Sequence, residues 1–516
     1  MHMPAPPLRP DRPRALVIGA GVAGLAASLR LAVGGMAVTL LERHSHLGGK
    51  IRTLPSAAGP VDAGPTVLTM RHVFDDLFAT AGERLEDHVT LIQQDILARH
   101  FWPDGSTLDL YADPARSKDA IAAFAGQRSA DDFDRFHKRT AKLFDAFATP
   151  MMRAAKPDLA RLVPMVMKRP DLARAMAPLS TLKQSLNREF CDKRLAQLFG
   201  RYATYVGGCP HLSPALLSLI WQAEASGVWV VEGGMHRLTE ALGDLAITQG
   251  VDVRTNAHVA EITLEHGRAI GARLADGTNL TADATLYAGD PRALATGSMG
   301  MALQSVAPQT VKLPRSLSAR VYSFAARPSG VDLAHHNVFF ASDSDSEFTD
   351  LAKGRMPRDP TLYLCAENRG QTTNPKGLER FEIIANAPAS DTETLKPELD
   401  QWHLQIMQTM AQRGVCFTPT PQTTSITTPH HFANLFPETQ GALYGQTPHG
   451  MTAALKRPIA QTKIPNLWLA GGGTHPGAGV PMATLSGKHA AAAILNARPS
   501  TSPSARMAMH GGTSTA

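Results

Sequence analysis

The sequence predicts an α/β protein with a discontinuous nucleotide-binding domain, and three observations support this prediction. The chain has 516 residues, which is more than a single hydrophobic core usually holds. A strand, a glycine-rich turn, a helix and a second strand follow one another at 14–42, and residues 466–496 repeat the strand, turn and helix. Residues 225–294 return to the same alternation after a long helical interval. One domain assembled from separated pieces explains this order better than a row of independent domains.

We therefore expect the nucleotide-binding domain to comprise residues 13–110, 225–294 and 456–496. Residues 111–224 predict a lobe of short helices that prolines interrupt. Residues 295–455 alternate strands with one helix and predict a sheet-plus-helix domain that binds the substrate. The last stretch, 497–516, predicts a disordered tail.

The first glycine-rich turn has the spacing of a dinucleotide site. The sequence GAGVAG places Gly19, Gly21 and Gly24 in the pattern GxGxxG, directly after a strand and at the start of a helix. These glycines permit a tight turn, close approach of a pyrophosphate and close helix–strand packing. Glu42 ends the second strand, where a carboxylate can accept hydrogen bonds from a ribose. A Rossmann-type dinucleotide site is predicted; ordinary packing of an alanine-rich helix is the alternative.

The loop after Glu42 indicates which dinucleotide binds. The stretch ERHSHLGGKIRT brings backbone amides of Gly48 and Gly49, and the cations Lys50 and Arg52, towards a diphosphate and a ribityl chain. This pattern resembles the extended fingerprint of flavin-containing amine oxidases and carotenoid desaturases, which favours FAD. The alternative for the two cations is an ordinary surface loop.

The second glycine-rich turn, GGGTHPGAGVPMATLSG at 471–487, is expected to hold the other end of FAD. Gly472 and Gly473 allow close backbone approach, and Met482 lies in the first turn of the helix that follows. The positive end of that helix would stabilise negative charge on the flavin ring. Two glycine-rich turns would then serve opposite ends of one cofactor.

Composition and charge exclude several classes of protein. The four cysteines form no CxxC pair, which argues against a disulfide framework and a zinc site and fits a reducing compartment. We predict no metal site, no secretory signal and no membrane-spanning helix.

The net charge is +6, yet residues 138–194 alone carry thirteen Lys or Arg and five Asp or Glu. This basic, partly apolar segment predicts docking on an anionic membrane, with an ordinary solvated lobe as the alternative. It has few aromatic residues, so nucleic acid is not an expected partner.

Four stretches together indicate a family. VIGAGVAGLAASLRL, LERHSHLGGK, DAGPTVLT and THPGAGVPMATLSGKHAA resemble the bacterial phytoene desaturase type of carotenoid desaturase. Within that family GPTVLTMRHVFDDLF, LARHFWPDGSTLDL and AAKPDL are similar to the 1-hydroxycarotenoid 3,4-desaturases of purple phototrophic bacteria. Met482 stands where phytoene desaturases usually have glycine, which favours this subgroup.

The resemblance implies FAD as the cofactor, a C40 acyclic carotenoid as the substrate, and oxygen or a membrane quinone as the electron acceptor. It also implies a cytoplasmic enzyme associated peripherally with the inner photosynthetic membrane. For the subgroup it implies that hydride transfer to the flavin introduces a C3–C4 double bond into 1-hydroxycarotenoids, in spheroidene or spirilloxanthin biosynthesis. The alternatives are phytoene desaturase or another desaturase or isomerase of the family, a flavin amine oxidase, and a non-catalytic carotenoid-binding protein.

The catalytic base cannot be identified from the sequence. His72 and His475 lie beside the motifs associated with the flavin and are the candidates, although a histidine near a flavin is often only a hydrogen-bond donor. We interpret Asp62, in DAGPT with Thr66, as a residue that ties down its turn and not as a catalyst.

Overall fold

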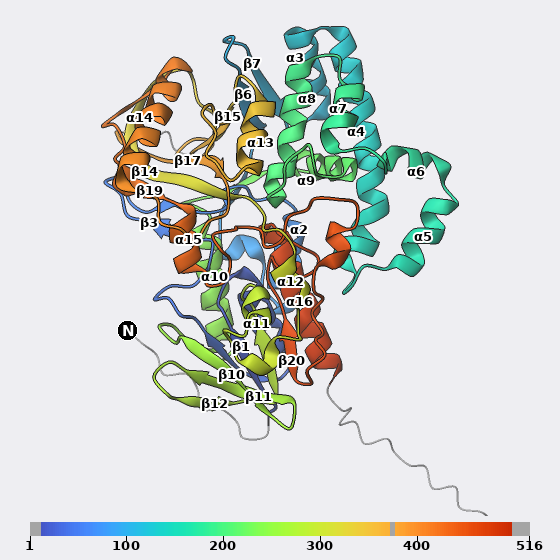
Figure 1. Ribbon diagram of the computed structural model, residues 1–516, viewed down its shortest axis with the longest axis vertical. Coiled ribbons are helices and arrows are strands. Elements are labelled where there is room, and N and C mark those ends of the chain that lie inside the picture. Colours follow the sequence, from blue (N-terminus) through green and yellow to red (C-terminus); the bar gives the residue numbers. More distant parts are fainter. Residues whose placement is uncertain (1–11, 372–376, 498–516) are drawn as a thin grey trace, which may run out of the picture.

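The computed structural model describes residues 12–371 and 377–497, so most of the predicted tail lies outside the described residues. A parallel sheet and its helices form one end of the molecule, and a larger sheet and a helical lobe form the other (Figure 1). The fold is therefore a mixed α/β fold with a Rossmann-type domain.

The parallel sheet has the strand order β20-β13-β1-β2-β9. Its strands come from the three separated parts of the chain: β1 (Arg14–Ile18), β2 (Ala37–Leu41), β9 (Asp252–Arg254), β13 (Ala284–Tyr287) and β20 (Leu467–Leu469). β1 lies between β2 and β13, with Val17 opposite Leu40 on one side and Leu286 on the other. The predicted discontinuous sheet is present because strands far apart in the sequence pair directly.

Two different layers cover the two faces of this sheet. Val17 and Leu40 pack against a face formed by α1 (Val22–Val33), α2 (His72–Thr80), α10 (His236–Thr248) and α16 (Val480–Asn496). Leu16 and Leu41 face the other way, towards the antiparallel sheet of β10 (Val259–Glu265), β11 (Arg268–Leu274) and β12 (Asn279–Thr281). The alternation of side chains along buried strands accounts for both layers.

The larger sheet has the order β18-β14-β17-β16-β15-β6-β7, and β19 also pairs with β14. Its strands are β6 (Ile96–Phe101), β7 (Thr107–Tyr111), β14 (Ser318–Gly330), β15 (His336–Phe339), β16 (Leu362–Ala366), β17 (Glu379–Ala387), β18 (Val415–Thr418) and β19 (Ile426–Thr427). One face packs against α14 (Lys396–Gln412) through Trp402 and Ile406.

The hairpin of β6 and β7 corrects one predicted boundary. It falls within 13–110, which the sequence assigns to the nucleotide-binding domain, but β6 pairs in parallel with β15 of the larger sheet. Val338 on β15 and Leu97 on β6 share the core beneath the helical lobe. A hairpin pattern specifies only its own two strands, so it gives no signal of which sheet it will extend.

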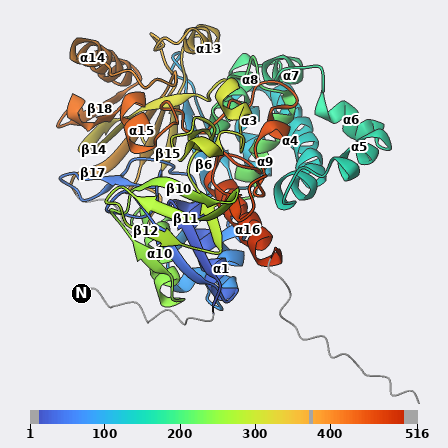
Figure 2. The same ribbon diagram turned by 60° about the horizontal axis from the view of Figure 1, so that its bottom comes forward.

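The helical lobe covers the other face of the larger sheet. It comprises α3 (Pro114–Ala125), α4 (Gln127–Phe147), η2 (Ala148–Arg153), α5 (Leu159–Met167), α6 (Pro170–Met176), α7 (Leu182–Glu189), α8 (Lys193–Gly200), η3 (Arg201–Val206), η4 (Ala215–Leu219) and α9 (Ile220–Ala225). Phe133, Phe136, Phe199 and Trp221 form its aromatic core. α5 and α6 project away from the rest of the lobe (Figure 1 and Figure 2).

The remaining elements connect these parts. They are β3 (Thr53–Leu54), β4 (Val61–Asp62), β5 (Leu91–Gln93), β8 (Trp229–Val231), η1 (Leu85–Asp87), α11 (Arg292–Ala295), η5 (Met301–Leu303), α12 (Gln309–Lys312), α13 (Ser344–Ala352), η6 (Thr423–Ser425), α15 (Pro429–Leu435) and η7 (Ala453–Lys456).

Close packing of α1 against α16 joins the two ends of the chain. A Cβ atom at Gly487 would lie 2.3 Å from the carbonyl oxygen of Ala23 and 3.2 Å from the Cβ of Ala26. The axes can approach this closely only because α16 carries glycine at the crossing. Both glycine-rich turns precede these helices, so the packing also fixes the position of one turn relative to the other.

We predict that Gly487→Ala separates these helices and lowers the free energy of unfolding by about 1–3 kcal/mol, the usual effect of overpacking a core. Denaturant unfolding of the purified protein measures the change. Ala492→Ser, at an exposed position of the same helix, is the control. Equal midpoints for the two variants would show that the crossing tolerates a side chain.

Candidate cofactor and active site

The first glycine-rich turn is built by contacts between backbone atoms. Gly19 has a φ of +102°, and a Cβ at Gly24 would lie 1.9 Å from the Gly19 carbonyl oxygen. Gly48 donates its N–H to the Ala20 carbonyl at 2.9 Å, and a Cβ at Gly48 would lie 2.3 Å from the Ile51 carbonyl oxygen. A Cβ at Gly49 would lie 3.1 Å from the Cα of Gly21. The two predicted glycine loops therefore lie against one another at the start of α1.

Glu42 lies beside this turn, at the end of β2. Its carboxylate is buried, with one oxygen accepting the N–H of Ala20 and the other the N–H of His44, both at 2.9 Å. Each carboxylate oxygen has a further lone pair. Glu42 is therefore fixed beside the first turn with lone pairs left to accept hydrogen bonds, and its binding of a ribose stays a prediction.

Lys50 and Arg52 extend from the same loop towards the other sheet. Lys50 Nζ donates to the Leu443 carbonyl at 2.5 Å, and Arg52 donates to the Thr427 hydroxyl at 2.9 Å. Burial lowers the pKa of Lys50 to about 8. These bonds connect the loop to residues 427–443, and the role of both cations at a diphosphate stays a prediction.

The second glycine-rich turn lies next to the first, with Ala288 between them. A Cβ at Gly471 would lie 3.1 Å from the Ala288 carbonyl oxygen, and one at Gly19 would lie 3.6 Å from the Ala288 carbonyl carbon. A Cβ at Gly473 would lie 2.6 Å from Pro291 Cδ, whereas Gly472 makes only ordinary contacts. Thus Ala288, directly after β13, brings both turns to one edge of the parallel sheet.

The second turn also has features that fit a bound ligand. The hydroxyl of Thr474 is buried and has no hydrogen-bond partner among the described residues. α16 starts at Val480, so its positive end lies at this turn, and Met482 is half-buried in its first turn. Together with the first turn and Glu42, these residues fit an extended dinucleotide such as FAD.

Arg457 is a further residue of this region that the motifs did not reveal. It is buried and donates to the carbonyls of Gly472 at 2.8 Å and Tyr444 at 3.2 Å. Burial lowers its pKa to about 10. Because it lies 15 residues before Gly472 in a stretch without a motif, only the three-dimensional structure identifies it.

The two candidate catalytic histidines have different surroundings. His475 is buried, and its Nε2 bonds to the Ala154 carbonyl at 2.9 Å; the neighbouring His489 bonds to the Met152 carbonyl at 3.1 Å. Burial lowers the pKa of His475, so the neutral ring is favoured. His72 is exposed at the first residue of α2. His475 therefore attaches η2 to the second turn, and direct catalytic roles for either histidine stay predictions.

Asp62 and Thr66 hold the DAGPT loop in place. The Asp62 carboxylate accepts the N–H of Met235 at 2.5 Å and lies 3.0 Å from Nδ1 of His236 at the start of α10. Thr66 shares a hydrogen bond of 2.6 Å with the hydroxyl of Tyr363. These bonds tie the loop to α10, and the interpretation of Asp62 as a structural residue stays a prediction.

Three buried side chains near this loop could in principle hold a metal ion. Among the described residues, ligand atoms of His335, His336 and Cys365 lie within 4.8 Å of one another. His335 bonds to the Arg369 carbonyl at 2.6 Å and contacts the Cys365 sulfur at 3.4 Å. Burial raises the pKa of Cys365 well above its usual value, which keeps the thiol protonated. Hydrogen bonding between neutral groups explains the cluster without an ion.

Comparison with known proteins identifies the family. The model of the family described as flavin containing amine oxidoreductase matches residues 22–495. Hydroxyneurosporene desaturase of Cereibacter sphaeroides is 55% identical over 94% of this chain and 97% of its own, and that of Rhodobacter capsulatus is 47% identical over 93% and 97%. Among solved structures, putrescine oxidase bound to putrescine has a TM-score of 0.61 at 13% identity, covering 94% of this chain and 99% of its own. Cyclohexylamine oxidase from Brevibacterium oxydans has a TM-score of 0.56 at 16% identity over 94% and 99%.

The chain therefore belongs to the flavin-containing amine oxidoreductases and, within them, to the carotenoid desaturases of purple bacteria. It is an oxidoreductase, and its cofactor is FAD. The two glycine turns and Glu42 lie together at one edge of the parallel sheet, and their role in holding this cofactor stays a prediction.

We predict that Glu42→Gln weakens FAD binding about tenfold, because one of the two acceptor oxygens becomes an NH₂ group facing a backbone N–H. Titration of apoprotein with FAD measures the dissociation constant. Glu240→Gln, at an exposed position of α10, provides the control. Unchanged affinity in Glu42→Gln would remove Glu42 from the FAD site.

Proposed function

We propose that this enzyme introduces the C3–C4 double bond into acyclic 1-hydroxycarotenoids of the hydroxyneurosporene type. The observation that supports this most strongly is the similarity over nearly the full chain to hydroxyneurosporene desaturases, at 55%, 47% and 41% identity. The third of these is from Rubrivivax gelatinosus. Met482, in place of the glycine usual in phytoene desaturases, agrees with this substrate.

The reaction sets three requirements for the chain. Bound FAD supplies the oxidant that takes up two electrons. The protein must hold a long apolar polyene with its saturated carbon pair in position, and it must exclude water from the positive charge that develops there. It must also accept the proton that the neighbouring carbon loses. The aromatic core of the lobe, with the larger sheet against it, makes this part of the protein apolar.

The direct test is the product formed in cells that accumulate either hydroxyneurosporene or phytoene. Expression of the gene should extend the chromophore of hydroxyneurosporene by one double bond and leave phytoene unchanged, as seen by chromatography and absorption spectra. A Gly24→Val variant, which cannot form the first turn, is the inactive control because its Cβ would meet the Gly19 carbonyl oxygen. New chromophores from phytoene alone would assign the enzyme to the phytoene desaturases. Peroxide released from simple amines would favour an amine oxidase.

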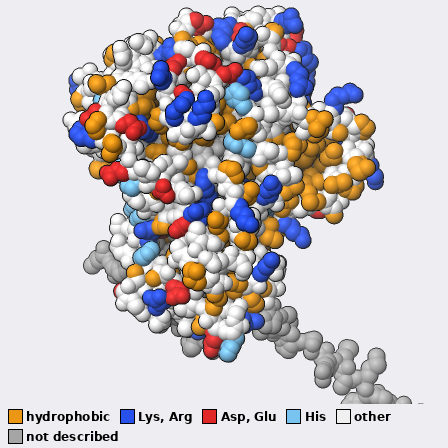
Figure 3. All heavy atoms as spheres, in the orientation of Figure 1, with side chains coloured by type: hydrophobic (Ala, Val, Ile, Leu, Met, Phe, Trp, Pro, Cys, Tyr) orange, Lys and Arg blue, Asp and Glu red, His pale blue; other side chains and the backbone are white. Residues whose placement is uncertain are grey.

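We also propose that the projecting part of the lobe docks on the membrane in which the carotenoid resides. Leu159, Val163 and Met167 follow one another at intervals of four along α5 and are exposed, Met167 to 78%. Figure 3 shows hydrophobic side chains gathered over α5 and α6, with Lys and Arg at the edge. No helix within residues 12–371 and 377–497 is long and apolar enough to cross a bilayer. An apolar helix face with basic residues beside it suits a position in the plane of the interface.

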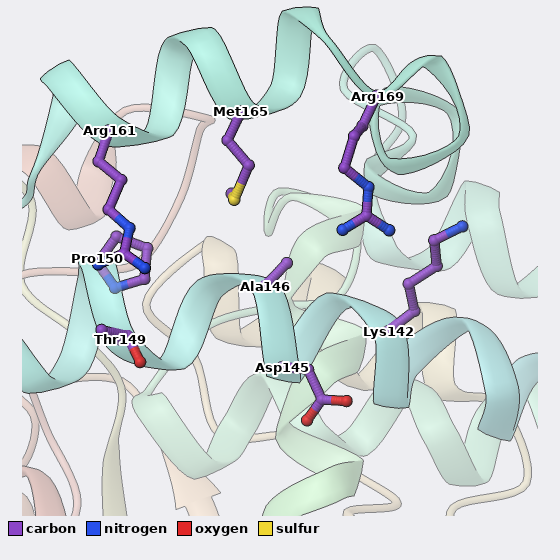
Figure 4. Close-up of a pocket in the computed structure, with 8 residues that line it drawn as sticks. All are labelled: Lys142, Asp145, Ala146, Thr149, Pro150, Arg161, Met165 and Arg169. Carbon is purple, nitrogen blue, oxygen red and sulfur yellow. The ribbon is translucent and has the colours of Figure 1, made fainter.

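A cavity behind α5 strengthens this proposal. It has a volume of about 370 Å³ and lies between α4 and α5. Lys142, Arg161 and Arg169 extend towards it from both sides, and Met165 adds an apolar wall (Figure 4). Asp171 forms ion pairs with Lys142 and Arg169, so Arg161 is the cation best placed to contact an anionic headgroup.

We predict that the double variant Val163→Glu with Met167→Glu loses at least about tenfold in affinity for vesicles of equal parts phosphatidylglycerol and phosphatidylcholine. The change removes exposed apolar side chains that the membrane would cover and adds charge of the same sign as the lipid. Co-flotation measures binding. Leu404→Glu, an equally exposed apolar residue on α14, should bind as the wild type does. Undiminished binding of the double variant would overturn this docking surface.

A further inference from the structure

A polar cluster lies where the helical lobe meets the larger sheet. Arg201 and Tyr205 of η3 lie at its centre, with Tyr363 of β16 beside them. Arg201 donates a hydrogen bond to the Tyr205 hydroxyl at 3.0 Å, and its guanidinium lies 5.4 Å from the centroid of the Tyr363 ring. The Tyr363 hydroxyl in turn bonds to Thr66 of the DAGPT loop and to His336, at 2.6 and 2.7 Å. The cluster thus connects the lobe, the sheet and that loop.

The surroundings of this cluster are largely apolar, and a hydrogen bond between Tyr205 and Glu224 extends it into the lobe. η3 packs into the core that contains Phe199 and Trp221. Tyr202, on the same helix, is buried and donates to Glu224 at 2.6 Å. Arg201 and Tyr205 are only half-buried. An arginine has five N–H donors and a phenol oxygen has more than one lone pair, so both can bond to a further oxygen.

One segment connects this cluster to both cofactor turns. The ring of Tyr444 lies against the residue that ends η3, since a Cβ at Gly207 would be 2.5 Å from Tyr444 Cδ2. The carbonyl directly before Tyr444 accepts from Lys50, in the loop that lies against the first turn, at 2.5 Å. The carbonyl of Tyr444 accepts from Arg457, which also donates to Gly472 of the second turn. The cluster is therefore next to the FAD-binding unit and not at a remote end of the molecule.

The chemistry of a 1-hydroxycarotenoid requires a polar group in such a place. Its tertiary hydroxyl is on C1, two bonds from C3, so the partner of this hydroxyl must lie close to the carbons that react. We propose that Arg201 and Tyr205 form the subsite that binds the C1 hydroxyl. Arg201 donates to the hydroxyl oxygen, and the hydroxyl proton is donated to the Tyr205 oxygen. The pair positions the C3–C4 bond and discriminates against carotenoids without the hydroxyl, an inference that rests on the proposed function.

Tyr205→Phe removes only the phenolic oxygen and tests this subsite. In purified holoenzyme with carotenoid in liposomes, we expect the ratio of kcat/KM for 1-hydroxyneurosporene over neurosporene to fall about tenfold, the effect of one hydrogen bond. The loss should come from the hydroxylated substrate, with kcat/KM for neurosporene unchanged. Tyr322→Phe, whose hydroxyl bonds to His403 in the core beneath α14, should keep the wild-type ratio. Arg201→Lys, which keeps the charge but loses the planar fork, should lower the ratio as Tyr205→Phe does.

Binding provides a second measurement that does not depend on turnover. Bound polyene should quench tryptophan fluorescence, and titration should show a preference for 1-hydroxyneurosporene that Tyr205→Phe reduces about tenfold. If the wild type converts 1-hydroxyneurosporene but both Tyr205→Phe and Arg201→Lys keep its selectivity, the subsite is wrong and the proposed function stands. If the wild type converts neither carotenoid, the proposed function fails. Equal binding of the two carotenoids by the wild type would then overturn the subsite as well.

Discussion

The close approach of two glycine-rich turns around Ala288 is the constraint on which the rest of this structure depends. Positive φ values of +102° and +112° favour glycine at Gly19 and Gly471, and a Cβ at Gly471 would lie 3.1 Å from the Ala288 carbonyl oxygen. Where Gly487 of α16 crosses α1, a Cβ would lie 2.3 Å from the Ala23 carbonyl oxygen and has no room. Turns more than 450 residues apart in the sequence can meet this closely only if the strands before them share a sheet. In this sheet β13 lies between β1 and β20, so the domain has to be assembled from three separated parts of the chain.

Buried basic side chains and two histidines attach the other parts of the protein to the domain that carries the two glycine-rich turns. Lys50 donates to the Leu443 carbonyl and Arg457 to the Tyr444 carbonyl. These bonds hold the segment that follows β19 of the larger sheet against the two turns. His489 of α16 bonds to Met152 of η2, and His475 bonds to Ala154 directly after η2, so the lobe is attached to the second turn and to the helix that follows it. A surface proposed to meet the membrane and a turn predicted to hold the cofactor are thereby parts of one connected arrangement. This suits an enzyme whose substrate is dissolved in a bilayer.

The parts of the site that could be predicted are those specified within a few residues. GxGxxG, Glu42 and the final glycine turn each combine a strand, a turn and a helix in contiguous sequence, and the structure places them together. Arg457, Arg201 and Tyr205 could not be found in this way, because their positions depend on contacts between segments distant in the chain. The same reason explains why the sequence assigns the hairpin of β6 and β7 to the wrong domain: its place in the larger sheet depends on pairing with the distant strand β15. The sequence also could not show that His475 bonds to the lobe.

The claim that most needs a direct measurement is that one FAD, held by both turns, oxidises a hydroxylated carotenoid. Anaerobic mixing of the holoenzyme with 1-hydroxyneurosporene in liposomes, followed by flavin absorbance, measures this without any electron acceptor. The account predicts bleaching of one FAD per chain, with formation of one equivalent of the product that has an additional double bond. A flavin that stays oxidised with 1-hydroxyneurosporene but is bleached by phytoene or by a simple amine would contradict it.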